Sequence, residues 1–440
     1  MSIGSPAGDR PGRLIRLPGV YFEDRLPVPS GMPDLMTGVP AFIGFADPEP
    51  DILARGRTPA VILDRWNADQ FGPMIRPSAG SFLAMAVRGF FANGGRRCVV
   101  LPVLPASGSK GFLDLLRLGG PLEDRSDIDL VCVPDAHSRL ADNSDIPYVR
   151  DDPYRIHAAA LAHCETMGDR FAILDAEDIS PAGEDHQDPV NEVLGKASSL
   201  RSACGALYFP WIAYDRSRDP LRVAVSPAAD LEWRYLPRPS GDDRHGPLEF
   251  GPPCGHVAGL FARLDARIGR HRAPANASLA DVADTSAHLS VDQYAQLNEG
   301  GVNCLRSLPG RGVDVAGART LSGHPALAYV SAARTVLGFR RWLEVGLRDI
   351  VFEPQTTMLW DRIRVRLTSR CLELVRSGAL AGTEPEQAFF VKCDSETNTP
   401  DEIDLGRVVA HVGLAPSVPA EFIIVRITHD PNGVTVSSLS

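Results

Sequence analysis

Long apolar runs are missing from this sequence, and this absence bears on where the protein resides. No stretch approaches the roughly 20 apolar residues that a membrane-spanning helix needs. Residues 1 to 15 also lack the apolar centre of a signal peptide. We therefore expect a protein that is made in the cytoplasm and is not inserted directly into a membrane.

Paired cysteine motifs are absent as well. The eight cysteines lie tens of residues apart, with no C-x-x-C and no histidine pair at a metal-binding spacing. Several stand in apolar surroundings, such as Cys98 in RRCVVLPV and Cys132 in DLVCVPD. This pattern argues against a metal site and predicts buried free thiols in a reducing compartment.

Catalytic and cofactor motifs are scarce. The glycine-rich LPGRGVDVAG (residues 308–317) lacks the Lys-Ser/Thr of a phosphate-binding loop, so its glycines are interpreted as turn formers. Asp127, Asp129, Asp135 and His137 flank one apolar strand without a nucleophile nearby, which favours turn and cap chemistry. We therefore expect no cofactor, no metal and no catalytic residue.

The pair Cys254 and His256 would project to the same side of a strand, but a metal or nucleophilic site there would need further partners.

Charge argues against a nucleic acid as the main partner. The 440-residue chain has a formal net charge of −10, and its tryptophans are not interleaved with basic residues as a single-strand binding surface would require. Its length is enough for two or three domains. The charge is uneven, because basic residues gather in the last third of the chain.

Residues 51–319 alternate between strand-like and helix-like segments. Strands are expected in TPAVILD, RRCVVLPV, DIDLVCVPD, RFAILDA and CGALYFPWIA. Helices are expected at residues 81–91, 154–168 and 189–202, and loops at 105–126, 141–152, 180–189 and 214–249. Such alternation is typical of a doubly wound α/β domain with a parallel sheet.

Two amphipathic helices dominate the last third. The first runs from Ala328 to Phe352 and the second from Thr357 to Leu380, where Thr356 or Thr357 is available as the N-cap. In the first helix we expect Tyr329, Ala332, Ala333, Val336, Leu343 and Leu347 to face a core, and in the second Leu359, Ile363, Leu367, Cys371 and Leu374.

Basic residues repeat along the opposite sides of both helices. Arg334, Arg341 and Arg348 recur every seven residues, and Arg362, Arg366 and Arg370 every four. Residues at these intervals project from nearly one line, so each set predicts a basic stripe. An ordinary solvated helix face is the simpler interpretation of either stripe.

Short apolar segments follow the second helix. Strands are expected in AFFVKCD, GRVVAHVGL and EFIIVRI, which with the two helices would make a compact α/β unit. Near the other end, LPGVYFEDRL contains a short strand isolated between prolines. A strand needs a partner for its backbone groups, so this one must pair elsewhere in its own chain or in another copy.

Ten segments in order along the chain resemble the contractile tail sheath proteins of phages and of phage-like extracellular injection systems. The last three cover the second helix and the strands after it. The segments are Pro18–Asp24, Val39–Asp47, Ala86–Val103, Asp169–Ala176, Ala206–Ile212, Gly251–Asn276, Leu297–Leu321, Val351–Arg364, Leu374–Asp394 and Asp404–Ile427.

The resemblance implies a structural subunit without catalysis. Such a subunit would polymerise as stacked six-membered rings around an inner tube and contract to drive the tube through a target envelope. Expected partners are other copies of the chain, the inner tube protein, baseplate and terminator proteins, and possibly sheath paralogues. The particle would be assembled in a bacterial cytoplasm, as a phage tail or as a tail-like device that the cell releases or retains.

The resemblance also implies a domain layout. Residues 1–25 would be an arm donated to a neighbour, residues 26–50 with 320–427 an inner domain, residues 51–319 an outer α/β domain, and residues 428–440 a tail. Strand exchange is expected through Val20, Tyr21, Phe22, Glu23, Phe422, Ile423, Ile424 and Val425. Which of EFIIVRI and VTVSSLS is donated stays open, as does which arginine stripe faces the tube.

Two alternatives remain at this stage. One is an α/β enzyme that binds a small ligand at the strand ends near Asp135 and Asp175. The other is a minor or baseplate-proximal paralogue within the sheath family.

Overall fold

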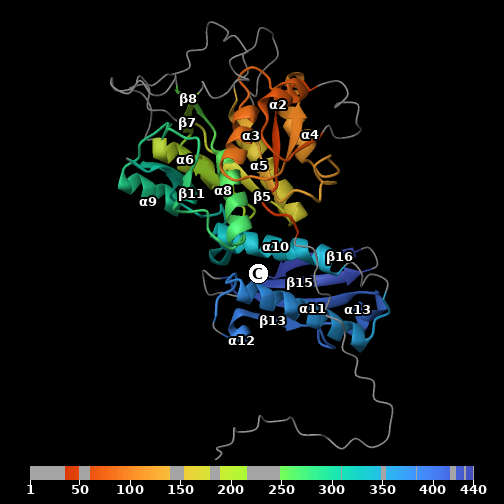
Figure 1. Cartoon of the computed structure of the whole chain (residues 1–440). Coiled ribbons are helices and arrows are strands. Elements are labelled where there is room, and N and C mark those ends of the chain that lie inside the picture. The colour runs from red at the N-terminus through yellow and green to blue at the C-terminus, as the bar shows by residue number, and fades with distance from the viewer. Residues whose placement is uncertain are drawn as a thin grey trace, which may run out of the picture. The chain divides into compact units, whose positions relative to one another are not determined.

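The computed structural model describes residues 35–48, 60–138, 153–178, 189–215, 248–308, 310–347, 353–382, 384–416, 423–430 and 433–439 (Figure 1). They fall within one compact unit, residues 34–440. The predicted N-terminal arm, residues 1–25, lies outside these ranges, as do most of the segments predicted as loops at 141–152, 180–189 and 214–249.

A large sheet forms the first part of the fold. Its strand order is β2 (Val61–Leu63), β3 (Cys98–Val103), β1 (Pro40–Phe45), β4 (Leu130–Cys132), β5 (Phe171–Asp175), β6 (Gly205–Phe209), β11 (Val302–Leu308), β12 (Gly312–Val315) and β9 (Ala277–Leu279). The strands from β3 to β11 are parallel. β1 and β3 are buried throughout, as expected for strands covered on both faces. The predicted doubly wound α/β architecture is confirmed.

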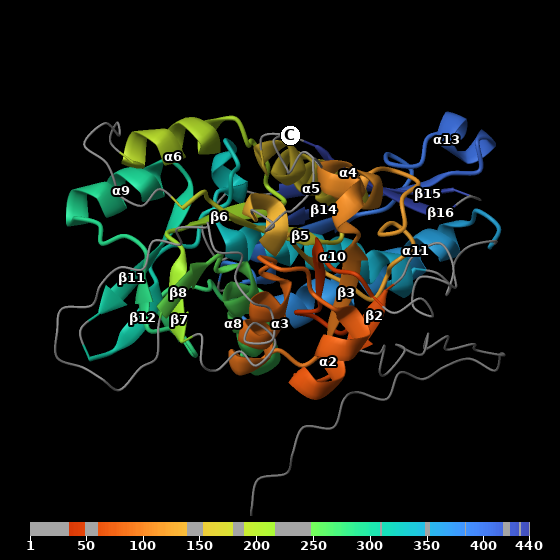
Figure 2. The same cartoon turned by 90° about the horizontal axis from the view of Figure 1, so that it is seen from above.

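Helices cover this sheet in pairs. α3 (Leu83–Ala92) packs on α8 (Cys254–Arg267), α4 (Gly108–Leu116) on α5 (Pro153–Met167), and α6 (Pro189–Ser198) on α9 (Val291–Glu299) (Figure 2). α2 (Ala68–Ile75) follows β2. Gly255 lets α8 approach α3 closely, because a Cβ on Gly255 would lie 2.2 Å from the carbonyl oxygen of Ala86.

Antiparallel strands extend the parallel sheet at both ends. β2 pairs with β3 at one end, and the hairpin β11–β12 with β9 completes the other. Gly310 and Gly312 have φ of 73° and 84° at this hairpin, so the glycines of LPGRGVDVAG shape a turn as predicted. A separate antiparallel sheet has the order β10 (Asp284–Thr285), β7 (Ile212–Asp215), β8 (Leu248–Gly251).

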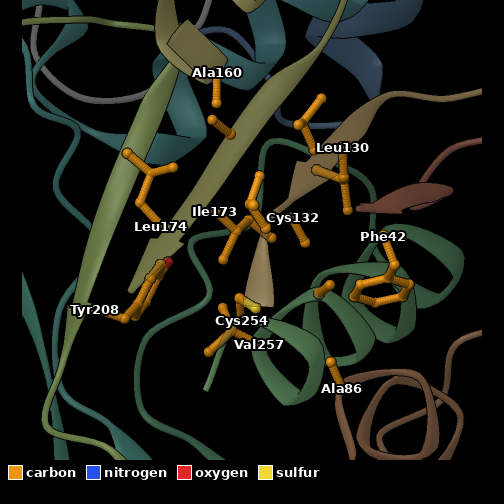
Figure 3. Close-up of a cluster of buried hydrophobic side chains, with 14 of the residues drawn as sticks. Phe42, Ala86, Leu130, Cys132, Ala160, Ile173, Leu174, Tyr208, Cys254 and Val257 are labelled. Atoms are coloured by element: carbon orange, nitrogen blue, oxygen red, sulfur yellow. The ribbon is translucent and has the colours of Figure 1, made fainter. Parts of the chain in front are cut away.

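The large core lies between the parallel strands and their helices. Phe42, Cys132 and Ile173 from three neighbouring strands belong to this core together with Val257 of α8 (Figure 3). Phe42 also packs edge-on against Phe90 of α3, with ring centroids 5.7 Å apart. This core explains the near-continuous apolar runs of the strands, since both of their faces exclude water.

The last third forms a second, smaller core. α10 (Val330–Gly346) and α11 (Thr357–Arg376) pack with an antiparallel sheet of order β13 (Phe389–Lys392), β14 (Val408–Leu414), β15 (Ile423–Asp430) and β16 (Gly433–Leu439). The short helices α12 (Pro385–Ala388) and α13 (Pro400–Asp404) connect these elements. Thr356 caps α11 as predicted, and Leu359, Ile363, Leu367 and Cys371 are buried.

Three expectations are wrong. β1 was assigned with residues 26–50 to the inner domain, but it lies between β3 and β4 in the large sheet. The segment 105–126 contains α4, whose apolar residues Phe112 and Leu116 are buried. Cys254 and His256 lie in a helix and not in a strand, because Gly255 and the apolar residues after it pack α8 against α3.

Candidate functional site

Helix α10 belongs to both cores. Val330, Ala333 and Leu337 pack into the large core, whereas Phe339 and Leu343 belong to the small one. A helix with apolar residues on more than one side is expected where it is covered on more than one side. α10 therefore joins the two cores through its own side chains, and its predicted inward residues Ala332, Ala333, Val336, Leu343 and Leu347 are buried.

Arg334 fixes this helix to the large core. Its Nη1 and Nη2 donate to Asp265 Oδ1 and Oδ2 of α8 at 2.8 and 2.6 Å. Asp129 Oδ2 lies 3.7 Å from Nη2, and the guanidinium stands 4.8 Å from the ring centroid of Phe261. Burial alone would lower the pKa of Arg334, but the charges of Asp265 and Asp129 raise it above its ordinary value.

Arg341 makes a second buried contact. Its Nη2 donates to the backbone oxygen of Ser126 at 2.8 Å. Between the two arginines, Gly338 leaves room for Arg270, since a Cβ on Gly338 would lie 2.0 Å from Arg270 Nη1. Burial lowers the pKa of Arg270. The side of α10 that was predicted to be a basic stripe is thus an internal contact between the two cores.

The arginines of α11 are also bonded within the chain. Arg362 pairs with Glu353, with Nη1 2.9 Å from Oε2. Arg366 Nη1 donates to the backbone oxygen of Gly346 at 3.2 Å, and Arg370 pairs with Glu373 at 2.7 Å. Arg370 also lies 5.6 Å from the ring centroid of Trp342 on α10. These three side chains are half-buried, so part of each is accessible.

The two predicted stripes therefore have different outcomes. Arg334 and Arg341 are each 4% exposed, so the prediction that they present an outward face is wrong. Their spacing in the sequence places both on one side of the helix. It could not reveal that this side contacts Asp265 and the backbone of Ser126. Arg348 lies outside the described residues.

Only part of the residues predicted to take part in strand exchange lies within the described structure. Val20, Tyr21, Phe22, Glu23 and Phe422 lie outside the described residues. Ile423, Ile424 and Val425 begin β15, which pairs with β14 on one side and β16 on the other. The described residues of both segments, 423–427 of EFIIVRI and 434–439 of VTVSSLS, thus pair in the sheet of their own chain. Within the described part of the chain, β13 and β16 are the two edges of this sheet.

Carboxylates at the ends of the large-sheet strands bind backbone N–H groups. Asp135 accepts from the N–H groups of Phe45 and Phe82 at 2.7 and 2.6 Å, and from Ser81 Oγ at 2.6 Å. Asp129 accepts from Gly38 N and Val39 N at 3.0 and 2.7 Å. The predicted cap and turn chemistry is confirmed for both residues.

Asp175 has a related role at the end of β5. Its Oδ1 accepts from the N–H of Cys254, the first residue of α8, at 2.8 Å, and its backbone oxygen lies 2.9 Å from His137 Nε2. Burial raises the pKa of Asp175 to about 7 against the opposing effect of the Cys254 hydrogen bonds. Throughout the described ranges, no group of three or more His, Cys, Asp or Glu residues is placed to hold a metal ion.

Sequence reasoning missed the buried network on α10. The sequence feature that could have indicated this network is the acidic Asp265, which lies in FARLDAR within a segment with the pattern of an amphipathic helix. Asp265 and Arg334 are 69 residues apart, so their pairing could not be read from local spacing.

Comparison with known proteins supports the predicted resemblance. Residues 205–321 match the family model of the phage tail sheath protein central domain. A comparison with curated protein sequences finds no match. The fold as a whole is that of contractile sheath proteins, as solved structures indicate.

Three solved structures show this likeness. The anti-feeding prophage (AFP) helical sheath in its contracted state has a TM-score of 0.63 and 24% identity, over 93% of this chain and 98% of that chain. The second structure is the contracted sheath complex of PVC, an extracellular contractile injection system. It has a TM-score of 0.61 and 20% identity, over 96% of this chain and 99% of that chain. The sheath tail protein from Desulfitobacterium hafniense has a TM-score of 0.53 and 9% identity, over 93% of this chain and 99% of that chain.

The buried Arg334–Asp265 pair generates a prediction about stability. Substituting Arg334→Ala leaves Asp265 buried without its partner, so we expect a loss of about 3–5 kcal/mol in the free energy of unfolding. The matched control is Arg364→Ala on α11, whose 2.6 Å pair with Asp361 is half exposed and should cost below about 1 kcal/mol. Urea unfolding monitored by circular dichroism measures both. Equal losses in the two variants would contradict the role of Arg334.

Asp175 generates a prediction about pH. Its folded pKa of about 7 exceeds the value of roughly 3.9 in an unfolded chain. The folded protein therefore binds this proton more tightly, and stability falls as pH rises from about 4 to about 7. In Asp175→Asn this contribution vanishes, so the melting temperature of the variant relative to the wild type should increase across that window. A flat difference for Asp175→Asn would refute the assignment.

Proposed function

We propose that this protein is a structural sheath subunit that polymerises as stacked six-membered rings around an inner tube and contracts to drive the tube through a target envelope. The observation that carries the proposal is the chain-wide likeness to sheath structures, which spans 93–96% of this chain and 98–99% of the two injection-system sheaths compared above. The match of residues 205–321 to the sheath central domain supports it from sequence.

The small sheet supports a role in linking copies. β13 pairs only with β14, and β16 only with β15, among the strands that the structure describes. An edge strand presents backbone N–H and C=O groups that another strand can satisfy. We propose that residues 20–23 of one copy, which read as an isolated strand, add to one of these edges in a neighbouring copy.

Such an attachment suits a subunit that must move. Main-chain hydrogen bonds hold a donated strand, while the Gly- and Pro-containing residues before and after it leave the angle between copies adjustable. A unit shifted from 1:99 to 99:1 between two states requires roughly 5.5 kcal/mol. A modest bias per subunit, summed over linked rings, therefore makes contraction all-or-none without a nucleotide.

Contacts with other components follow from the same proposal. The half-buried arginines Arg362, Arg366 and Arg370 are the candidates for contact with an acidic tube exterior, since Arg334 and Arg341 are internal. Baseplate and terminator proteins would hold the two ends of the stack, and the particle would be assembled in a bacterial cytoplasm. None of the described helices is long and apolar enough to cross a membrane.

Electron microscopy of the purified protein tests the assembly. We expect the full chain to form rings or cylinders, because each copy can lend a strand to the next. Deleting residues 1–25 should leave a folded protein, as judged by circular dichroism, that forms no cylinders. Long cylinders from the shortened chain would contradict strand exchange. A full chain that stays a small closed oligomer and converts a substrate would contradict the sheath function itself.

The tube contact is tested by neutralising the three α11 arginines. We expect Arg362→Gln, Arg366→Gln and Arg370→Gln together to reduce sheath assembly on purified tubes and to weaken its dependence on salt, because charge-charge contacts at a surface are screened. Co-sedimentation at low and high salt measures this. Arg376→Gln and Arg364→Gln, at exposed positions of the same helix, serve as controls, and unchanged assembly by the triple variant would exclude the contact.

A further inference from the structure

A short segment beside the four-stranded antiparallel sheet carries exposed apolar side chains. It comprises residues 399–407, with α13 at its centre. Ile403 is 38% exposed and Leu405 is 59% exposed. Asp401 and Asp404 flank them, both exposed, and neither makes an ion pair with any residue in the described part of the chain. We call this surface, formed by Asp401, Ile403, Asp404 and Leu405, the acidic tip.

The acidic tip is held rigidly. Asn398 is buried next to it, where its Nδ2 donates to the backbone oxygens of Asp394 and Val409 at 2.9 and 3.1 Å and its Oδ1 accepts from Val409 N at 2.7 Å. Glu402 points back to the sheet and pairs with Arg426 of β15 at 2.9 Å. An exposed apolar surface that is ordered before it binds loses less conformational entropy on binding.

A complementary surface lies at the end of α8. Arg267 is its last residue, Ile268 follows with 53% of its surface exposed, and Arg272 lies one turn further. The turn is closed by the bond from Arg272 N to Gly269 O at 3.1 Å. Neither arginine has an ion-pair partner among the residues that the structure describes, and the nearby Asp265 is engaged by Arg334. We call Arg267, Ile268 and Arg272 the basic patch.

We propose that the acidic tip of one copy binds the basic patch of a second copy. The acidic tip presents two exposed aliphatic side chains and the basic patch one. Each surface also carries two charges of one sign that have no ion-pair partner among the described residues, and the signs of the two surfaces are opposite. Opposite charges around a small apolar contact align two partners and disfavour the alternatives in which like charges meet.

The geometry of this contact favours an open polymer. The acidic tip belongs to the small sheet and the basic patch to a helix of the large sheet, so the contact joins two different surfaces. Such a heterologous contact repeats from copy to copy and generates rings or helical filaments. The inference rests on the proposed sheath function, which requires lateral or axial contacts besides the exchanged strands.

Charge reversal tests the contact in the full-length chain. One variant combines Asp401→Lys with Asp404→Lys, a second combines Arg267→Glu with Arg272→Glu, and a third carries all four substitutions. We expect each double variant to need a concentration higher by about tenfold or more for assembly, the equivalent of one unit in the logarithm of affinity. The fourfold variant should recover most of this loss, because the charges are again opposite.

A matched control separates this effect from net charge. Glu384→Lys at the N-cap of α12, combined with Glu386→Lys within α12, changes the net charge as much as the reversed acidic tip. Both residues are exposed and have no ion pair in the described ranges. It should assemble like the wild type. Sedimentation of polymer across a concentration series gives the readout, and circular dichroism checks folding.

The outcomes distinguish the inference from the function on which it rests. If the wild type polymerises and all variants assemble at the same concentration as the wild type, the proposed contact is wrong while the sheath function stands. The same conclusion follows if the double variants assemble poorly and the fourfold variant does not recover assembly. If reversal of the acidic tip impairs assembly only when tube protein is present, the tip binds the tube and not a second copy, which also overturns the contact. If the wild type forms no polymer, the sheath function itself fails.

Discussion

The arrangement of this protein depends on one buried ion pair. Arg334 of α10 and Asp265 of α8 meet in a bidentate contact at 2.6 and 2.8 Å, away from water. α10 supplies side chains to both hydrophobic cores, so the pair fixes the helix that the cores share. A buried charge is stable only with a well-placed partner. The relative position of the two cores is therefore specified by geometry as well as by apolar contact.

The strand ends of the large sheet are occupied by side chains of the chain itself. In open α/β sheets, ligands commonly bind beyond the carboxyl ends of the strands. Here Asp135 and Asp175 occupy those ends and bind the first N–H groups near α3 and α8. Helix N-termini favour negative charge. The carboxylates thus supply from within the chain what an anionic ligand would supply elsewhere, and they fasten helices to the sheet.

Much of the fold could be predicted from the sequence, because the pattern of apolar residues is local. The buried runs at Cys98–Val103 and Phe171–Asp175 indicated parallel strands, and the spacing of Leu359, Ile363 and Leu367 indicated the inward face of α11. The candidate site on α10 was harder to predict. Arginines at seven-residue spacing resemble a solvated stripe, and only the distant Asp265 shows that Arg334 is internal. In the same way, α4 was missed because its burial depends on packing against α5.

The small sheet has a consequence for the timing of assembly. Its outer strands, β13 and β16, leave backbone groups on both borders without a strand partner in the described part of the chain. Under the proposed sheath function, either border can accept a strand from another copy before any scaffold is present. If association of the first few copies is unfavourable and later additions are favourable, polymerisation begins slowly. It then accelerates once a small assembly, the seed, is present. If the protein is the sheath subunit proposed above, a cell that makes it would then govern where cylinders form by supplying the seed.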